Sequence, residues 1–456
     1  MQKNLESSVI VAKFGGTSVA DYSALQRCAD IIQNNPAIRL VVVSAAAGVT
    51  NRLVALSKGV ENEKERLQLL SEVMDIQHQI SQHLSPTPEL NAQLRDYLVR
   101  MALLSNQLAE QGAEAAKQDE LLAFGERCSS MFLAEILRQR GHTARDFNAC
   151  LAIRTDSHFG AAEARPVRIS MLVREHLTPL LANYCVVTQG FIGADAADRV
   201  TTLGRGGSDL SAALFAEALR AHTLQIWTDV DGIYTCDPRQ VPTARPIPEI
   251  TFAEAAEMAT FGAKILHPAT LLPAQRAKVP VFIGCTREPE KAGTWVRNTT
   301  QQRPMCRALS VRKGQVLLTA RSLNMLHARG FLAELFAILA RHRISVDLIT
   351  TSEVSVALTL DTTGSQSAGK ALVSEALLAE LAPLCDVKVE DGLALIALIG
   401  HQLSETPEVA GRVFQVIAPK NIRMISQGAS PNNLCVLVQE TDAAEILQAL
   451  HSNFLD

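Results

Sequence analysis

The sequence lacks the features that mark membrane, nucleic-acid-binding and disulfide-bonded proteins. No segment approaches the roughly 20 apolar residues that a membrane span requires, and the N-terminal run in MQKNLESSVIVAKF is short and contains a lysine. The formal net charge is -4, and Lys and Arg are not gathered into runs, which argues against nucleic acid as a partner. The nine cysteines form no C-x-x-C pair, so we expect reduced, buried thiols. We therefore expect a soluble, cytoplasmic protein without a membrane or nucleic-acid partner.

Two common nucleotide-binding patterns are also missing. The pattern G-x-x-x-x-G-K-[ST] is absent, which argues against a P-loop NTPase. No G-x-G-x-x-G follows the first predicted strand, as a dinucleotide-binding fold would need. A phosphate site in this chain would therefore have to be built in another way.

The first two-thirds of the chain alternates short β-branched runs with helical stretches. Length alone predicts two or three domains, and the alternation predicts a mainly parallel sheet with helices on both faces. The clearest helix is Phe252–Phe261, because Thr251 and Glu254 form a capping box. Residues 61–110 read as a helical pair interrupted by SPTP. The predicted strands are 9–12, 40–44, 184–188, 225–227 and 279–283.

The C-terminal third contains an internal repeat. The segment Gly330–Ile349 aligns without gaps to a later one, so that Phe336 matches Phe414 and Ile344 matches Ile422. Extending both copies gives two βαββαβ modules, of which the second ends one strand short, so we expect the modules to share or swap strands. In the first module we predict strands 315–319, 354–360 and 387–390 and a helix over 370–384. In the second we predict strands 393–399, 422–425 and 434–438 and helices over 408–418 and 443–454. The predicted boundaries are a catalytic domain at 1–290, a linker at 291–312, and modules at 313–391 and 392–456.

Four polar, glycine-containing loops follow predicted strands. They are VAKFGGTS, SAAAGVTN, TTLGRGGSD and WTDVDGIYTCDPR. Any one of them could be a simple turn, but the carboxyl ends of strands in an open parallel sheet meet at one crevice, where ligands bind. Glycines let backbone N–H groups approach phosphate oxygens closely, and Lys13 stands where a buried strand becomes such a loop. The four loops together predict a ligand site.

Six motifs in this order resemble the signature set of the aspartate kinases. They are KFGGTSV, SAAAGVT, FGER, TTLGRGGSD, WTDVDGIYTCDPR and MATFGAKILHPAT, and the resemblance covers essentially the whole chain. It implies an α/β amino acid kinase fold followed by two interlocked ACT domains, which are βαββαβ and ferredoxin-like. The stretch that begins NMLHARGFLAELF most resembles the lysine-sensitive, monofunctional branch of the family. We therefore expect no homoserine dehydrogenase domain.

The resemblance implies that the γ-phosphoryl group of ATP is transferred to the β-carboxylate of L-aspartate, giving 4-phospho-L-aspartate. This reaction opens lysine, threonine and methionine biosynthesis. A carboxylate with a pKa of about 3.9 is already an anion at neutral pH and needs no general base. Lys13 would neutralise charge on the transferring phosphoryl group, with Mg²⁺ carried by the nucleotide, and Asp209 would hold Lys13 or the metal. We predict no metal site made by the protein alone.

The family motifs also assign the two substrate positions. Arg205 would clamp the aspartate α-carboxylate and Glu126 would take the ammonium group, with Thr50, Gly207 and Ser208 completing that side. The nucleotide side would comprise Lys13, Gly15, Gly16, Ser18, Thr228, Asp229, Tyr234, Arg239 and Lys264.

We expect feedback inhibition by L-lysine bound at the first ACT module. Asp347 and Glu353 can each pair with the lysine ε-ammonium, whereas the second copy has Ile425 and Pro431 at those places. The other positions assigned to this site are Met325, Gly330, Phe331, Leu332, Ser345, Val346 and Ser352. Because each module offers an open sheet edge, we expect a homodimer through the ACT domains, with a tetramer as the alternative.

Two other functions compete with this interpretation. A kinase of the same fold could act on another acidic amino acid, such as glutamate or acetylglutamate, but FGER and the double ACT-like tail argue against it. A non-catalytic amino acid sensor could have kept the fold, but the intact Lys13, Asp209 and GRGGS argue against that.

Overall fold

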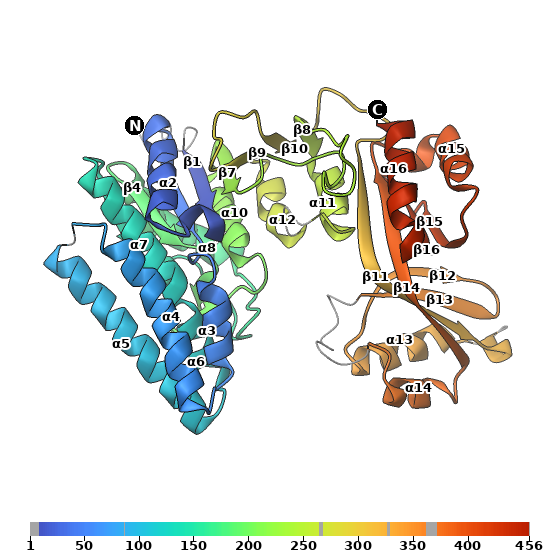
Figure 1. Cartoon of the computed structure of the whole chain (residues 1–456), viewed down its shortest axis with the longest axis horizontal. Coiled ribbons are helices and arrows are strands. Elements are labelled where there is room, and N and C mark those ends of the chain that lie inside the picture. The colour runs from blue at the N-terminus through green and yellow to red at the C-terminus, as the bar shows by residue number, and fades with distance from the viewer. Residues whose placement is uncertain (1–8, 86, 264–267, 326–328, 362–371, 456) are drawn as a thin grey trace. The chain divides into compact units, whose positions relative to one another are not determined.

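The computed structural model describes residues 9–85, 87–263, 268–325, 329–361 and 372–455 (Figure 1). It divides into two compact units. The first unit comprises residues within 1–233, 246–256 and 265–300, and the second unit residues within 234–245, 257–264 and 301–456. The predicted nucleotide residue Lys264 lies outside the described residues.

The first unit is built on an eight-stranded sheet in the order β3-β4-β2-β1-β7-β9-β10-β8. Its pairs are parallel except that β9 and β10 are antiparallel. The chain moves from β1 outward to β2 and β4 on one side, and later from β7 to β9 on the other. The strand order therefore reverses between β1 and β7, the place where open α/β sheets bind ligands. The strands are β1 Ile10–Phe14, β2 Ile38–Val43, β3 Ala144–Phe147, β4 Cys185–Gln189, β7 Thr223–Thr228, β8 Glu249–Thr251, β9 Val281–Cys285 and β10 Thr294–Arg297.

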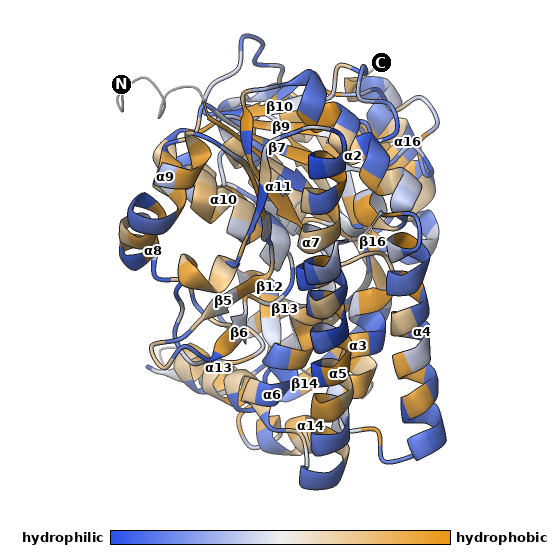
Figure 2. Cartoon of the chain, turned by 90° about the vertical axis from the view of Figure 1, so that its left-hand side faces the viewer, coloured by the Kyte–Doolittle hydropathy of each residue, from blue (hydrophilic) through white to orange (hydrophobic). Residues whose placement is uncertain are grey.

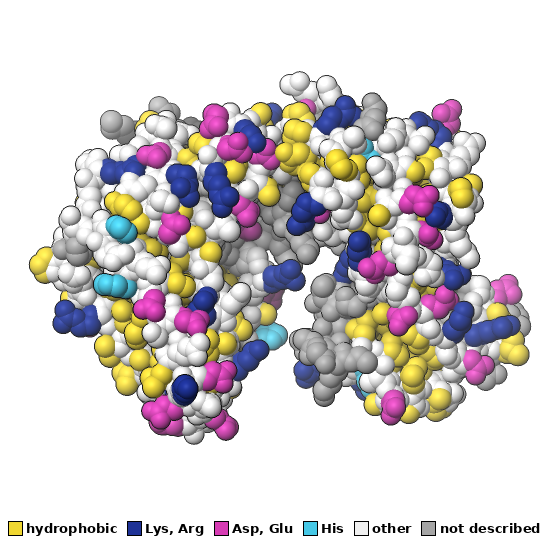
Figure 3. Space-filling model, in the orientation of Figure 1, with side chains coloured by type: hydrophobic (Ala, Val, Ile, Leu, Met, Phe, Trp, Pro, Cys, Tyr) yellow, Lys and Arg dark blue, Asp and Glu magenta, His cyan; other side chains and the backbone are white. Residues whose placement is uncertain are grey.

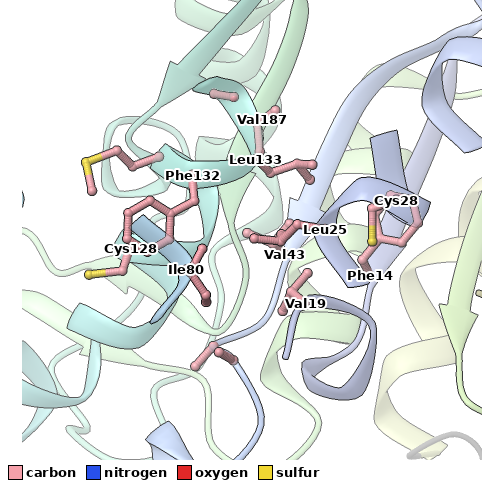
Figure 4. Close-up of a cluster of buried hydrophobic side chains, with 14 of the residues drawn as sticks. Phe14, Val19, Leu25, Cys28, Val43, Ile80, Cys128, Phe132, Leu133 and Val187 are labelled. Atoms are coloured by element: carbon pink, nitrogen blue, oxygen red, sulfur yellow. The ribbon is translucent and has the colours of Figure 1, made fainter. Parts of the chain in front are cut away.

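The central strands form because they are apolar and buried on both faces, as in a parallel sheet covered by helices. Figure 4 shows part of this core, where Phe14 of β1, Val43 of β2 and Phe132 of α7 lie among other buried side chains. A two-stranded sheet, β5 Ile192–Ala194 with β6 Val200–Thr202, completes the unit. The strands are connected by helices α2 Tyr22–Asn34, α3 Val49–Ser57, α4 Glu63–Ser81, α5 Pro88–Gln111, α6 Ala115–Leu122, α7 Phe124–Gln139, α8 Pro166–Leu172, α9 Thr178–Leu181, α10 Gly207–Leu219 and α12 Pro268–Ala277. Helix α11 Phe252–Thr260 has residues in both units.

Five predicted strands and the best-marked helix of this unit are present, with ends shifted by a few residues. The capping box is confirmed, because the Thr251 hydroxyl accepts from the Glu254 N–H at 3.2 Å while the Glu254 carboxylate accepts from the Thr251 N–H at 2.9 Å. The helical pair is also confirmed as α4 and α5, and both helices carry polar and apolar residues in alternation (Figure 2). Strand β3 was missed because its sequence, ARDF, is half polar.

The second unit contains one six-stranded sheet, in the order β12-β13-β11-β14-β16-β15. Its strands are β11 Ala308–Arg321, β12 Ser345–Thr351, β13 Ser355–Asp361, β14 Asp386–Ile399, β15 Ile422–Gln427 and β16 Asn433–Gln439. Its helices are α13 Phe331–Arg341, α14 Glu375–Leu381, α15 Glu408–Ile417 and α16 Ala443–Phe454. Strands β11 and β14 are each 14 residues long and pair along their length.

These two long strands interlock the modules, as the sequence predicts. The first half of β11, including Leu309, packs in the core of the second module, while its second half, including Leu318, packs in the core of the first. The strand missing from the second repeat is therefore supplied by residues that precede the first. The separate strands predicted at 387–390 and 393–399 are one continuous strand, β14, in which Gly392 has a φ of +65°. This continuity is not recognisable in the sequence, because a glycine between two apolar runs is typical of a bend or turn.

Two strands begin inside the predicted linker, β10 at Thr294 and β11 at Ala308. Helix α14 is shorter than the predicted 370–384, since Ser374 caps its N-terminus by accepting from the Leu377 N–H at 3.2 Å. The precise domain boundaries remain predictions.

Surface and thiol properties follow the composition. Among the described residues, no helix is both long and apolar enough to span a bilayer. Acidic and basic side chains are interspersed on the face drawn in Figure 3. All nine cysteines are free thiols, of which eight are buried as expected and Cys150 is half-buried.

The shared strand predicts which module each half of β11 stabilises. Leu309→Ala should cost about 2–5 kcal/mol of stability and reduce hydrogen-exchange protection in β16 and the second half of β14. Leu318→Ala should instead reduce hydrogen-exchange protection in β13 and in the region around α13. Exchange measured by mass spectrometry on the two variants would contradict the strand sharing if Leu309→Ala loosened the first module alone.

Candidate active site

An ion pair joins the end of β1 to the start of α10. Lys13 Nζ lies 2.6 Å from Asp209 Oδ1, and the two side chains are only 10% and 16% exposed. Asp209 lies in the first turn of α10, where the helix dipole favours a negative charge. Gly206 precedes this helix with a φ of +73°, and a Cβ on Gly207 would come within 2.7 Å of the Phe191 ring. The glycines thus let α10 begin close to the strand ends.

The two glycines after Lys13 leave room beside its ammonium group. A Cβ on Gly15 would lie 3.5 Å from Lys13 Nζ, and one on Gly16 would lie 3.0 Å from the Ala45 carbonyl. The Gly15 N–H donates to the Trp227 carbonyl at 3.0 Å, which fastens the β1 loop to the end of β7. A lysine ammonium close to a glycine loop is an arrangement suited to phosphate oxygens.

Ser18 has a structural partner set. Its hydroxyl is buried and lies 2.5 Å from the hydroxyl of Thr286, which itself donates to the Thr228 carbonyl at 3.1 Å. Ser18 therefore holds the β1 loop against the ends of β7 and β9. Its assignment to the nucleotide stays a prediction.

Glu126, in the first turn of α7, is a buried carboxyl group with spare acceptor capacity. It is 3% exposed, and burial raises its pKa to about 8. A hydrogen bond from the Ala45 backbone N–H and the charge of Lys13 partly offset this increase, because both lower the pKa. Its Oε2 has no hydrogen-bond partner among the described residues. An unpartnered buried carboxylate oxygen is suited to a cationic ligand group such as an ammonium.

The loop after β2 meets the start of α7 at very short range. A Cβ on Gly125 would lie 2.5 Å from the Ala45 Cβ, so the glycine of FGER is required for this approach. Gly48, with a φ of +85°, caps α3, whose first turn carries the half-buried Thr50. FGER and SAAAGVT are therefore brought together, as the motifs suggest.

Arg205 is exposed and has no ion-pair partner among the described residues. It lies between Gly204 and Gly206, both with positive φ, just before Gly207 and Ser208 of α10. A Cβ on Gly190 would lie 2.6 Å from the Ser208 Cβ, so the turn after β4 packs directly on this helix start. The position of Arg205 is thus fixed by the backbone of this glycine-rich turn.

The nucleotide-side residues fall in both units. Thr228 and Asp229 follow β7 in the first unit, and the Thr228 hydroxyl donates to the Asp229 carboxylate at 3.1 Å. Tyr234 and Arg239 belong to the second unit. The Arg239 guanidinium donates twice to the Asp237 carboxylate and lowers the pKa of that carboxyl to about 2. No group of three or more His, Cys, Asp or Glu side chains in the described regions could hold a metal ion.

A second ion pair, in the second unit, includes the predicted effector residue Asp347. Asp347 Oδ2 lies 3.0 Å from Arg312 Nη1, with both side chains about one-seventh exposed (15% and 14%). Asp347 lies at a β-bulge, because Val346 pairs with Leu360 while Ile349 pairs with Leu358. A bulge redirects side chains, and the Asp347 side chain at this bulge forms its ion pair with Arg312 of β11.

The other effector positions differ in exposure. Gly330 caps α13 with a φ of +92°, Leu332 and Glu353 are exposed, and Phe331 is buried in the core of the first module together with the partly buried Met325. Ser345 and Val346 are half-buried at the start of β12. The Ser352 hydroxyl lies 2.7 Å from the Ser355 hydroxyl across a turn.

Two structurally important residues had no signal in the sequence. Arg312 falls in the predicted linker, and Phe191 adopts a φ of +68° that is unusual for a bulky residue. Backbone contacts and pairs between distant segments leave no local pattern.

Known proteins resemble this chain over its whole length. The amino acid kinase family matches residues 8–285 and the ACT domain matches residues 396–454. Lysine-sensitive aspartokinase 3 of Escherichia coli is 53% identical over 99% of this chain and 100% of its own. The crystal structure of E. coli aspartokinase III in complex with aspartate and ADP superposes with a TM-score of 0.88, at 52% identity over 98% of this chain and 100% of that one. The complex of the same enzyme with lysine and aspartate gives 0.86, at 52% identity over 99% and 100% of the two chains.

The fold and the Lys13 site define an amino acid kinase with ACT modules, which confirms the predicted fold class. Within that class, the chain belongs to the aspartokinase family.

The buried Glu126 predicts a pH-dependent stability. Its pKa is raised from an ordinary value of 4.5 to about 8, so between these values the folded chain holds a proton that the unfolded chain has released. Stability from this group is therefore full below pH 4.5 and is lost as the pH rises to about 8. Melting temperatures of the ligand-free protein from pH 5 to 8 should fall less for Glu126→Gln than for the parent, and equal slopes would contradict the burial of an ionisable group there.

Proposed function

We propose that the chain is an ATP-dependent aspartate kinase that forms 4-phospho-L-aspartate. The observation that carries the proposal is the buried Lys13–Asp209 pair beside a glycine loop, with the unpartnered carboxyl oxygen of Glu126 on a neighbouring helix. One part suits a phosphoryl group and the other an amino acid. The complexes of the E. coli enzyme with aspartate and ADP, and with lysine and aspartate, support the same ligands here.

In the proposed reaction, the β-carboxylate attacks the γ-phosphorus and ADP leaves. The attack brings two anions together, so the main requirement is positive charge around the transferring group. Lys13 supplies such charge at the end of β1, and Asp209 holds its ammonium in place. Mg²⁺ would enter with the nucleotide and supply further positive charge to the transferring group, and Asp209 is the nearby carboxylate that could hold it. The nucleotide would be bound by Gly15, Gly16, Thr228, Asp229, Tyr234, Arg239 and Lys264.

The amino acid would be held by its α-substituents. Glu126 would accept the ammonium group and Arg205 would bind the α-carboxylate, with Thr50 and Ser208 contributing hydroxyls. An N-acetylated substrate has no ammonium to place against Glu126, which argues against acetylglutamate. The chain would work in the cytoplasm as a homodimer.

L-Lysine is the proposed feedback inhibitor, binding at the first ACT module. Its ε-ammonium would take the Asp347 carboxylate, which Arg312 occupies in this structure. Inhibition requires that lysine bind an inactive arrangement more tightly than the active one.

A substrate panel tests the activity. ADP formation should be measured with ATP, Mg²⁺ and, separately, L-aspartate, L-glutamate and N-acetyl-L-glutamate. Turnover with aspartate alone supports the proposal, whereas turnover with glutamate alone, or with none, would refute it.

Lys13→Ala should leave a folded protein that has lost most of its turnover. Removing one group that stabilises transition-state charge costs about 3–4 kcal/mol, or a few hundredfold in kcat. Lys58→Ala, which removes an exposed lysine after α3, is the matched control and should behave like the parent. A kcat for Lys13→Ala within threefold of the parent would refute its role.

The Asp347–Arg312 pair predicts two opposite effects on inhibition. Asp347→Ala should abolish lysine inhibition, because the ε-ammonium loses its partner. Arg312→Ala should lower the lysine concentration for half-inhibition by about fivefold, or ~1 kcal/mol, because a competing cation is removed. The readout is the ratio of inhibited to uninhibited rate within each variant. Unchanged or weaker inhibition in Arg312→Ala would contradict the competition.

A further inference from the structure

Asp119, on α6, is a buried carboxylate that joins three segments of the first unit. It is 2% exposed. Its Oδ2 accepts from the Gly160 N–H at 2.9 Å and from the Thr202 N–H at 2.7 Å, and its Oδ1 accepts from the Thr202 hydroxyl at 2.9 Å. No sequence motif marks this residue and the reaction described above makes no use of it.

On one side, these bonds fix the segment that leads to Arg205. Thr202 is the last residue of β6, and only Leu203 and Gly204 separate it from Arg205. Gly204 has a φ of +73°, and a Cβ there would lie 3.3 Å from the Gly160 carbonyl. The Ala162 N–H also donates to the Thr202 carbonyl at 2.8 Å. Asp119 therefore holds Thr202, from which the loop carrying Arg205 continues, and Gly160, against which that loop packs.

On the other side, Asp119 belongs to the helical segment that carries Glu126. It lies seven residues before Glu126, across the junction of α6 and α7 at Ala123. The Ala123 N–H donates to the Asp119 carbonyl at 3.2 Å, and the Arg127 N–H donates to the Ala123 carbonyl at 3.2 Å, so helical hydrogen bonding continues through the junction. The position of Asp119 is thus tied closely to that of Glu126.

We propose that Asp119 is a positioning residue that sets the separation between Glu126 and Arg205, and so the fit of the site to the ammonium and carboxylate groups on one α-carbon. The proposal rests on the proposed function, in which these two residues hold the substrate. Both groups of an α-amino acid are fixed to the same carbon, so a small change in the separation weakens both contacts together. Arg205 depends on such support because its exposed side chain has no partner of its own among the described residues.

The kinetic test compares two substitutions at this position. Asp119→Ala leaves the N–H groups of Gly160 and Thr202 without their acceptor, and should raise the KM for L-aspartate by about tenfold or more, with the KM for MgATP changed less than about threefold. Asp119→Asn should restore most of the aspartate affinity, because its amide oxygen can accept from both N–H groups while its NH₂ donates to the Thr202 hydroxyl. Thr202→Val, which removes only the hydroxyl, should have a smaller effect of about threefold.

The matched control is Asp195→Ala. Asp195 is equally buried and accepts from the N–H groups of Ala197 and Arg199 and from the Ser157 hydroxyl, but it lies at the opposite end of the β5–β6 hairpin from Arg205. It should lower the melting temperature as Asp119→Ala does, while raising the KM for aspartate less.

A double-mutant cycle with Arg205→Ala identifies the route of the effect. If Asp119 acts through Arg205, adding Asp119→Ala to Arg205→Ala should raise the KM for aspartate by less than about threefold further. Full multiplication of the two effects, equal changes in both KM values, or an unchanged aspartate KM in Asp119→Ala would overturn the proposal. A parent enzyme that does not phosphorylate aspartate would instead refute the proposed function.

Discussion

The structure depends on the pairing of Lys13 with Asp209. A lysine at the end of a buried strand is costly unless its charge is compensated. Asp209 compensates it, because its Oδ1 lies 2.6 Å from Lys13 Nζ. Asp209 lies in the first turn of α10, where the helix dipole itself favours an anion. To reach this distance, α10 must begin close to β1, which explains the glycines at 206 and 207 and the close packing of Gly190 on Ser208. The ammonium also lies close to the backbone of Gly15, where an added Cβ would be 3.5 Å from Nζ. The ion pair and the proposed phosphate site therefore both require α10 to begin close to the end of β1.

A second ion pair between distant segments lies in the second unit. Asp347 is paired with Arg312, which lies on the half of β11 that pairs with the second module, while Asp347 lies in β12 of the first. The interlocked strands are what bring the two side chains together. An effector cation at Asp347 would replace a contact between the modules, which gives ligand binding a direct way to favour one arrangement of the modules over another.

The sequence predicted the features that depend on local pattern. The five apolar strands, the Thr251 capping box and the helix at 443–454 were recognisable because each is defined by neighbouring residues. The shared strand β11 was deducible only as a missing element. The continuity of β14 through Gly392 has no local signature either. Arg312, the Ser18–Thr286 contact and the Asp119 network could not be predicted, because each joins segments far apart in the chain. Glu126 was placed by motif, but its burial and raised pKa required the structure.

The most direct test of the central claim is identification of the product. The chain is incubated with ATP, Mg²⁺ and L-aspartate in the presence of hydroxylamine, which converts an acyl phosphate into a hydroxamate at the same carboxyl group, and the product is identified by mass spectrometry and NMR. The account predicts aspartate β-hydroxamate in equal amount to the ADP formed, and its loss in Lys13→Ala. ADP without hydroxamate, or hydroxamate at the α-carboxyl group, would contradict it.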